Sequence, residues 1–208
     1  MLGMVLRRPR TPLVAEVRPD PEPGPGEVRL RVRACRVCRT DLHVADGDLA
    51  THGAVIPGHE IVGRVDAIGP GVTGMALGER RGVPWLGGTC GRCAYCREGR
   101  ENLCDAPEFT GWTRDGGYAD TVIARADYCF PLPDSLSDTQ AAPLLCAGLI
   151  GFRAWRLAPG GRQPGAPAPL PADRRGQPRA GPVGGAARPR GGGRASDQDG
   201  ALHEAGEG

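Results

Sequence analysis

The sequence predicts a mainly β domain with some α structure over residues 1–157, followed by a tail of low complexity. Short stretches in which apolar residues occupy alternate positions, separated by turns rich in Gly and Pro, are typical of a β-barrel or a β-sandwich. All nine aromatic residues lie at or before Trp155. The residues that can form a core are therefore confined to the first part of the 208-residue chain.

The strands are expected between residues 4 and 124. Apolar residues alternate with arginines over 28–33, which predicts a half-buried strand in a region of short strands, 4–34. The Pro- and Gly-rich run 19–26 predicts a loop, because proline fits neither a helix interior nor a central strand. Further strands are expected at 61–69, 82–86 and 118–124. Glycine inside the first of these indicates a bend or a close backbone approach.

Two regions favour helices. Residues 35–46 contain neither Gly nor Pro and predict a short helical segment. From Ser137 the composition changes to Ala, Leu and Cys, which predicts helix over 138–148 and again over 149–157. Ser137 is a suitable N-cap, and Pro143 is expected to start or kink a turn.

Residues 158–208 are expected to form a disordered tail. Gly, Pro, Ala and Arg dominate them, and the large aliphatic side chains are only Leu170, Val183 and Leu202. So few apolar groups cannot offset the entropy cost of ordering the segment. The abrupt change after Leu157 favours a shifted reading frame in the gene or its recorded sequence. A genuine low-complexity linker or interaction tail is the alternative.

Charge and hydropathy exclude several classes of partner. The formal net charge is only +2, which gives no electrostatic reason to expect nucleic acid or a membrane surface as a partner. In the tail, acidic residues interrupt the arginines and no aromatic residue is present for base stacking. No segment resembles a membrane-spanning helix, and the N-terminus lacks the apolar core of a signal peptide. We therefore expect a cytoplasmic protein.

Four of the eight cysteines form the strongest motif in the chain. Their spacing, Cys90-x2-Cys93-x2-Cys96-x7-Cys104, lets four thiolates converge on one tetrahedral Zn²⁺ within a lobe over 88–106. Such a closed set leaves no coordination position for a substrate, so its expected role is structural. Two disulfides or an iron–sulfur cluster are the alternatives; disulfides are disfavoured in a reducing compartment.

A second set of ligand-type residues is dispersed over the chain. Taken singly, Cys146 fits a small core residue and His59 fits a hydrogen-bonded core histidine. Together with Cys38 they supply three ligands, which suits a catalytic zinc whose fourth position is left to water or substrate. Carboxylates that could orient these ligands, and groups suited to a short proton relay, lie nearby: Asp41 and Glu60, and Thr40 and His43.

These motifs, in this order, resemble the zinc-dependent alcohol dehydrogenases of the medium-chain dehydrogenase/reductase family over residues 1 to about 157. The motifs that carry the resemblance are Cys38-Arg39-Thr40-Asp41-Leu42-His43, Gly58-His59-Glu60, the four cysteines of the lobe, Asp115-Gly116-Gly117-Tyr118-Ala119-Asp120, and Cys146-Ala147-Gly148. One departure is Arg36, where the family commonly has Gly. If that position needs a tight turn, Arg36 would cost stability.

The resemblance implies a fold, two zinc sites and a reaction. The fold is the GroES-like catalytic domain, a distorted β-barrel. The catalytic zinc would be held by Cys38, His59 and Cys146, and the structural zinc by Cys90, Cys93, Cys96 and Cys104. Thr40 and His43 would relay the proton, and Arg39 would lie near the pyrophosphate of NAD or NADP. The reaction is NAD(P)-linked oxidation of an alcohol to an aldehyde or ketone, with a small-molecule alcohol or aldehyde as partner and the formation of a homo-oligomer left open.

The cofactor half of such an enzyme is expected to be absent from this chain. Its mark is a strand, then G-x-G-x-x-G, then a helix, and nothing after Leu157 matches that pattern. We therefore expect a truncated dehydrogenase with little or no turnover by itself. The alternative is a non-enzymatic two-zinc binding module. A zinc-free quinone reductase relative is disfavoured by the presence of both ligand sets.

Four further residues are given no site role by these motifs. Cys35 and Cys129 are expected to be packing residues. Trp85 and Trp112 are expected either to line a substrate pocket or to belong to the core.

Overall fold

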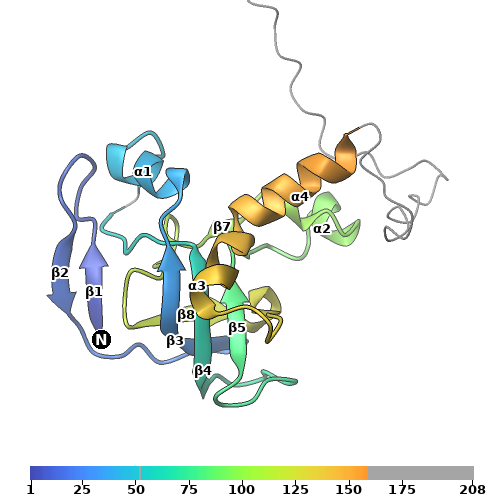
Figure 1. Cartoon of the computed structure of the whole chain (residues 1–208), viewed down its shortest axis with the longest axis horizontal. Helices are drawn as coiled ribbons and strands as arrows, with labels where there is room; N and C mark the ends of the chain where they lie inside the picture. Colours follow the sequence, from blue (N-terminus) through green and yellow to red (C-terminus); the bar gives the residue numbers. More distant parts are fainter. Residues whose placement is uncertain (52, 159–208) are drawn as a thin grey trace, which may run out of the picture. The chain divides into compact units, whose positions relative to one another are not determined.

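The computed structural model describes residues 1–51 and 53–158, and strands dominate it (Figure 1). The expected disordered tail therefore lies, from residue 159 onward, outside the described residues. The strands are β1 (Leu2–Val5), β2 (Val14–Val17), β3 (Glu27–Arg36), β4 (Glu60–Ile68), β5 (Arg80–Val83), β6 (Leu86–Gly88), β7 (Glu108–Phe109), β8 (Thr121–Arg125) and β9 (Phe130–Pro131). The helices are α1 (Arg39–Asp46), α2 (Ala94–Arg97), α3 (Asp138–Ala141) and α4 (Ala147–Leu157), with three 3₁₀ turns, η1 (Glu101–Leu103), η2 (Ala126–Tyr128) and η3 (Ala142–Leu145).

One five-stranded antiparallel sheet, ordered β8-β3-β4-β5-β9, forms the centre of the fold. Two small antiparallel pairs, β1-β2 and β6-β7, accompany it. Within β3 the predicted alternation is confirmed: Val28 and Leu30 are fully buried, Arg29 between them is partly exposed, and Arg31 and Arg33 after them are exposed. The loop predicted at 19–26 is confirmed as well, since it contains neither helix nor strand.

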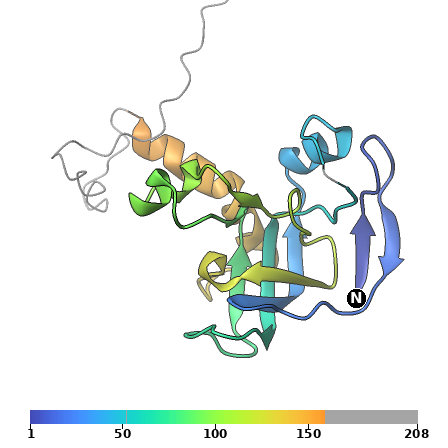
Figure 2. The same ribbon diagram turned by 180° about the vertical axis from the view of Figure 1, so that it is seen from behind.

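Strand β4 packs on both of its faces. Successive side chains of a strand point to opposite sides, so Ile61 and Val62 enter different clusters. Ile61 belongs to the main core, which also contains Val28, Leu30, Val65, Val83, Val122, Ala124 and Cys129. Val62 packs against Ala141, Ala142 and Leu145 of α3 and η3. These two short elements therefore cover one face of the sheet (Figures 1 and 2), and they lead directly to Cys146.

Gly63 marks a close approach between β3 and β4. A Cβ atom added there would lie 2.9 Å from the carbonyl oxygen of Arg31 and 3.0 Å from the Cβ of Leu30. The register of the two strands shifts nearby, between Val32 and Ala34. The expectation that a glycine in this strand indicates a close backbone approach is confirmed.

The helix expected over 35–46 begins only at Arg39. Cys35 and Arg36 remain in β3, where they pair with Ile61 and Glu60 of β4. Arg36 therefore has an extended backbone, and the expected cost of a non-glycine residue in a tight turn does not arise there. Cys35 packs against the main core, as expected for a packing residue.

The helix expected over 138–148 is divided into α3 and η3. Ser137 caps α3 as predicted, because its side chain accepts a hydrogen bond from the N–H of Gln140, whose own side chain returns to the Ser137 backbone. Pro143 supplies no N–H donor, and the chain continues as a 3₁₀ turn up to Leu145. A new helix, α4, then begins after Cys146.

Two of the expected strands have different bounds. The segment 82–86 is divided between β5 and β6 by Pro84 and Trp85. The strand expected over 118–124 begins at Thr121, because the N–H groups of Gly116–Tyr118 donate to carbonyl oxygens of residues 56–58 and the Tyr118 oxygen accepts from Met4 of β1, so this stretch does not pair with the central sheet.

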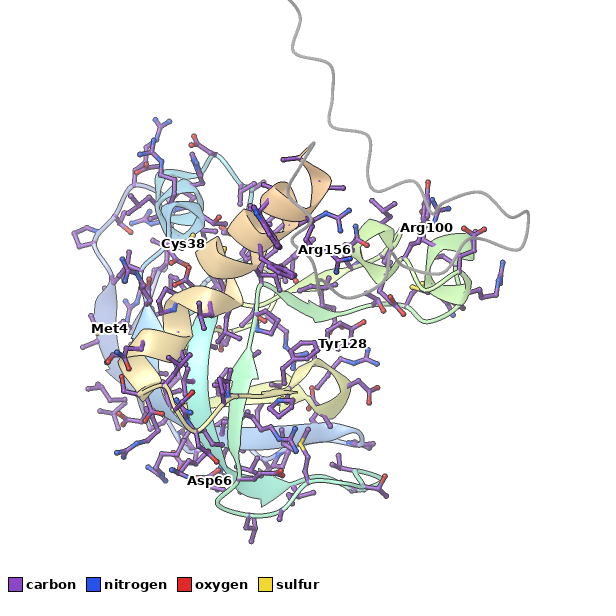
Figure 3. All side chains as sticks on the ribbon, turned by 45° about the vertical axis from the view of Figure 1, so that its right-hand side comes forward. Met4, Cys38, Asp66, Arg100, Tyr128 and Arg156 are labelled. Carbon is purple, nitrogen blue, oxygen red and sulfur yellow. The ribbon has the colours of Figure 1, made fainter. Side chains whose placement is uncertain are left out.

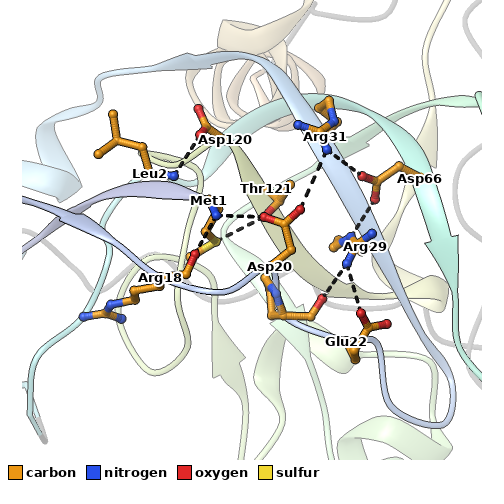
Figure 4. A network of polar contacts seen from close by, with 11 residues as sticks. Met1, Leu2, Arg18, Asp20, Glu22, Arg29, Arg31, Asp66, Asp120 and Thr121 are labelled. Carbon is orange, nitrogen blue, oxygen red and sulfur yellow. Dashed lines mark hydrogen bonds and ion pairs between the residues drawn. The ribbon is translucent and has the colours of Figure 1, made fainter.

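An ion-pair network joins the N-terminus to the exposed arginines of β3 (Figure 4). The Met1 ammonium lies 2.8 Å from a carboxylate oxygen of Asp20, and Arg31 lies 3.9 Å from the other oxygen of that carboxylate. Asp66 of β4 pairs with Arg29 at 2.9 Å and with Arg31 at 3.4 Å. The charged face of β3 is thus neutralised by neighbouring carboxylates. Among the described residues, no helix is long and apolar enough to cross a membrane.

Candidate metal centres

The sulfur atoms of Cys90, Cys93, Cys96 and Cys104 all lie within 4.8 Å of one another, and we call this set the four-cysteine site. The chain reaches this geometry through tight turns at Gly91 and Gly99, whose φ angles are +68° and +69°. None of the eight cysteines forms a disulfide in the part of the chain that the structure describes. Four convergent thiols match the donor set of a tetrahedral zinc ion.

Backbone N–H groups point at these sulfur atoms. The N–H of Cys93 donates to Cys90 Sγ at 3.4 Å, and the N–H of Cys90 donates to Cys104 Sγ at 3.3 Å. Backbone hydrogen bonds lower the pKa of Cys90 to about 6, and they also lower the pKa of Cys93. Burial raises the pKa of Cys96 to about 11. The loop therefore stabilises negative charge on two of its thiols, as a cation-binding site requires.

A second cluster combines donor atoms from three separate segments. Cys38 is the N-cap of α1, His59 and Glu60 lie where β4 begins, and Cys146 lies between η3 and α4. Their donor atoms are also all within 4.8 Å of one another, and the two sulfur atoms are 3.7 Å apart. We call Cys38, His59 and Cys146 the mixed site; Figure 3 labels Cys38 where the chain enters α1.

His59 is fully buried and held in one orientation. Its Nδ1 lies 2.9 Å from Oδ1 of Asp41, whereas its Nε2 has no hydrogen-bond partner among the described residues. Burial opposes the ionisation of Asp41, but hydrogen bonds from His59 and the Cys38 N–H hold the pKa of Asp41 below its ordinary value. Burial would lower the pKa of His59, but Asp41 outweighs it and raises that pKa. The carboxylate thus makes Nε2 more basic and leaves it free for a metal ion.

Glu60 brings a second buried carboxylate to the mixed site. One of its oxygens, Oε2, has no hydrogen-bond partner within the described ranges, and burial raises the pKa of this carboxyl group. The sequence pattern predicts an orienting role for Glu60. The geometry places its carboxylate close enough to the two thiols and the imidazole to be a donor itself.

The expected relay and cofactor residues all lie on α1. Thr40 Oγ1 is 3.9 Å from Cys38 Sγ, so the hydroxyl lies beside the mixed site. His43 is one turn further along the helix, half-exposed, with its Nδ1 2.7 Å from a carboxylate oxygen of Asp48. Arg39 is exposed at the first position of the helix and forms no ion pair with any described residue. Asp48 was not among the predicted residues, although its spacing of five from His43 placed it nearby.

Two other contacts were not predicted. The Tyr118 hydroxyl donates a hydrogen bond to Oδ2 of Asp41 at 2.9 Å. The Trp85 ring packs edge-on against His59, with ring centroids 4.9 Å apart, and stacks with Phe109 and Trp112. Tyr118 and Trp85 are distant from His59 in sequence, and only the folded chain brings them together.

Known proteins share this domain. Residues 24–134 match the family described as the alcohol dehydrogenase GroES-like domain. A Mycobacterium tuberculosis protein named as a probable alcohol dehydrogenase, AdhA, is 51% identical over 151 residues, which are 68% of this chain and 44% of that protein. An alcohol dehydrogenase of Geobacillus stearothermophilus is 42% identical over 167 residues, which are 79% of this chain and 49% of that protein.

The solved structures agree. The crystal structure of an NAD-dependent alcohol dehydrogenase is 33% identical and has a TM-score of 0.71, over 77% of this chain and 49% of that one. The chain thus spans less than half the length of the curated relatives and of the solved enzyme named above. Because the family model matches more than half of its residues, the chain belongs to the family of the alcohol dehydrogenase GroES-like domain.

Proposed function

We propose that residues 1–157 form the catalytic domain of a zinc-dependent, NAD(P)-linked alcohol dehydrogenase that interconverts alcohols with aldehydes or ketones. One observation carries the proposal. Three donors of the type that zinc prefers converge from separate segments, and the histidine among them presents a buried Nε2 with no other partner in the described structure. A buried polar atom without a partner is uncommon in native proteins and calls for an explanation, and a metal ion bound between His59 and the two thiols supplies one.

In this proposal the two sites have different roles. The mixed site holds zinc through two thiolates and an imidazole, with Glu60 beside it and one position left to substrate. Zinc held there supplies Lewis acidity toward an alcohol or carbonyl oxygen. The four-cysteine site offers four thiolates and no open position, so it stabilises the lobe that carries it. Asp41 orients His59 through the hydrogen bond described above.

Two side chains of α1, those of Thr40 and His43, are proposed to carry the proton away from the substrate. Thr40 accepts the proton of a substrate hydroxyl that lies beside Cys38, and it passes its own proton toward His43. His43 is half-exposed, with its Nδ1 held 2.7 Å from a carboxylate oxygen of Asp48, so its ring is in contact with solvent, to which it can release the proton. Arg39, exposed and free of any ion pair with the described residues, is the proposed contact for the cofactor pyrophosphate. A nicotinamide cofactor bound beside the site would supply the hydride acceptor.

The location proposed for the protein is the cytoplasm. All eight cysteines are free thiols in the part that the structure describes, and thiols in metal-type clusters are typical of a reducing compartment.

A chimera tests the enzymatic proposal. Residues 1–158 are joined to the remaining half of the Mycobacterium tuberculosis relative, because that protein shares 51% identity over the matched region. We expect NAD(P)-dependent alcohol oxidation that is lost in a Cys146→Ser version of the chimera. A folded chimera with zinc at both sites but no activity toward any alcohol or aldehyde would overturn the proposal and favour a non-enzymatic zinc module.

A further inference from the structure

The segment Asp115–Tyr118 clamps the segment that precedes His59. Four hydrogen bonds join them: Ile56 N–H to Asp115 Oδ1 at 2.8 Å, Gly116 N–H to the Ile56 oxygen at 2.6 Å, Gly117 N–H to the Gly58 oxygen at 2.9 Å, and Tyr118 N–H to the Pro57 oxygen at 3.0 Å. The clamp belongs to the motif Asp115–Asp120, to which the proposed reaction assigns no role. Because the clamp contacts the residues directly before His59, it can help to position this proposed metal ligand.

The clamp needs glycine at three points of contact. Gly58 has a φ of +98°, and a Cβ atom there would lie 2.6 Å from the Tyr118 ring. A Cβ on Gly116 would overlap the Gly58 oxygen, and one on Gly111 would lie 2.8 Å from the Gly58 nitrogen. Backbone therefore packs directly on backbone, and the residue before His59 has little freedom to move.

Tyr118 extends the clamp to the ligands themselves. Its hydroxyl donates to Oδ2 of Asp41, which also accepts the Cys38 N–H at 2.7 Å. The other oxygen, Oδ1, faces His59 Nδ1 at 2.9 Å. One buried carboxylate thus contacts the histidine ligand through one oxygen and the backbone of a cysteine ligand through the other.

We propose that Tyr118 is a positioning residue for the metal at the mixed site: it fixes the Asp41 carboxylate by a hydrogen bond and the approach to His59 by packing its ring on Gly58. The proposal rests on the proposed function, since it takes the mixed site to bind zinc. Tyr118 acts through Asp41, not by touching metal or substrate.

Tyr118 can affect His59 because the two oxygens of the Asp41 carboxylate contact different groups. Two donors on Oδ2 oppose rotation of the carboxylate plane and favour the orientation in which Oδ1 points at His59. That bond keeps the proton on Nδ1 and the lone pair on Nε2, which is the tautomer that a metal ion binds. Without the hydroxyl, Asp41 has a donor on Oδ2 only from the Cys38 backbone, and the orientation of His59 is less tightly defined.

The test measures zinc affinity in the full chain by competition with a chromophoric chelator. Cys146→Ser first identifies which of the released ions belongs to the mixed site. Tyr118→Phe removes the hydroxyl and keeps the ring, and we expect roughly tenfold weaker zinc binding at the mixed site, the lower end of the range for residues that support ligands. The matched control is Tyr128→Phe, because the Tyr128 hydroxyl contacts Thr89 at 2.6 Å instead of Asp41.

A double-mutant cycle separates positioning from a general loss of stability. If Tyr118 acts through Asp41, Tyr118→Phe should have a smaller effect in an Asp41→Asn chain than in the native chain. An equal effect in both backgrounds, no effect in the native chain, or an equal loss at the four-cysteine site would overturn the proposal. If the native chain binds zinc at the four-cysteine site alone, the proposed function itself fails, which is a separate and recognisable result.

Discussion

The imidazole of His59 and the carboxylate of Asp41 form a buried pair, with His59 Nδ1 2.9 Å from Asp41 Oδ1. Asp41 belongs to α1 and His59 immediately precedes β4, so the pair ties the start of a central strand to the helix that Cys38 caps. It also decides which nitrogen of His59 faces the mixed site. The carboxylate is therefore the point at which the fold controls the metal chemistry proposed for this domain.

Replacement of Asp41 by Asn should weaken zinc binding at the mixed site by about 10- to 100-fold. Asn keeps the shape of the side chain but accepts hydrogen bonds on one side only, so either His59 or the Cys38 N–H loses its acceptor. Chelator competition measures the effect. The matched control is Asp48→Asn, which removes the partner of His43 and should leave zinc affinity unchanged. Equal affinities of the Asp41 variant and the native chain would contradict this account.

Removal of one thiol from the four-cysteine site should release a single zinc ion and destabilise the lobe. In Cys93→Ser the remaining three donors no longer close a tetrahedron, and the free energy that metal binding contributes to folding is lost. We expect zinc content to fall from two ions to one, together with a lower Tm. Cys129→Ala removes a buried core thiol that belongs to neither site and should retain both ions. Retention of both ions by Cys93→Ser would show that the four sulfur atoms do not share a metal.

Gly58→Ala should lower the free energy of unfolding by more than Gly71→Ala does. Gly71 also has a positive φ, +79°, but a Cβ there would meet nothing within 4 Å. Both substitutions impose backbone strain, and only Gly58→Ala adds overlap with the Tyr118 ring, worth about 1–3 kcal/mol. Urea unfolding of the two variants measures the difference. Equal destabilisation would mean that the Tyr118 ring moves aside at little cost, and that the clamp therefore does not fix the position of His59.

The ion pair between Asp20 and the Met1 ammonium predicts a pH dependence of stability. The hydrogen bond from the ammonium holds the pKa of Asp20 below its ordinary value of 3.8. A carboxylate with a depressed folded pKa stabilises the fold above 3.8, and this contribution is lost as the pH falls through the lower folded value. Asp20→Asn should therefore be less stable than the native chain at neutral pH. Urea unfolding at a series of pH values should show that the difference disappears in acid; a difference that persists there would contradict the assignment.

The sequence predicts the local features of this fold well. The alternation over 28–33 predicts the buried face of β3, because side chains of a strand alternate whatever the strand pairs with. Ser137 identifies the start of α3, because its cap is made within four residues. The spacing of the four cysteines predicts their convergence, because all four lie within 15 consecutive residues.

Features that depend on distant contacts could not be predicted in this way. Residues 35–46 contain no helix breaker, yet Cys35 and Arg36 stay in a strand because β4 offers them partners. The distance between Asp41 and His59 depends on the register of β3 against β4 and on where α1 begins. Tyr118 is separated from Asp41 by 77 residues, and no local pattern marks its hydroxyl as a partner of that carboxylate.

The central claim is that the mixed site binds zinc through two thiolates and an imidazole. Zinc X-ray absorption of the Cys93→Ser chain tests it most directly, because that chain should retain only this ion. We predict a first shell with two sulfur atoms at about 2.3 Å and lighter nitrogen or oxygen donors at about 2.0–2.1 Å. A chain without bound zinc, or a shell made of sulfur alone, would contradict the claim.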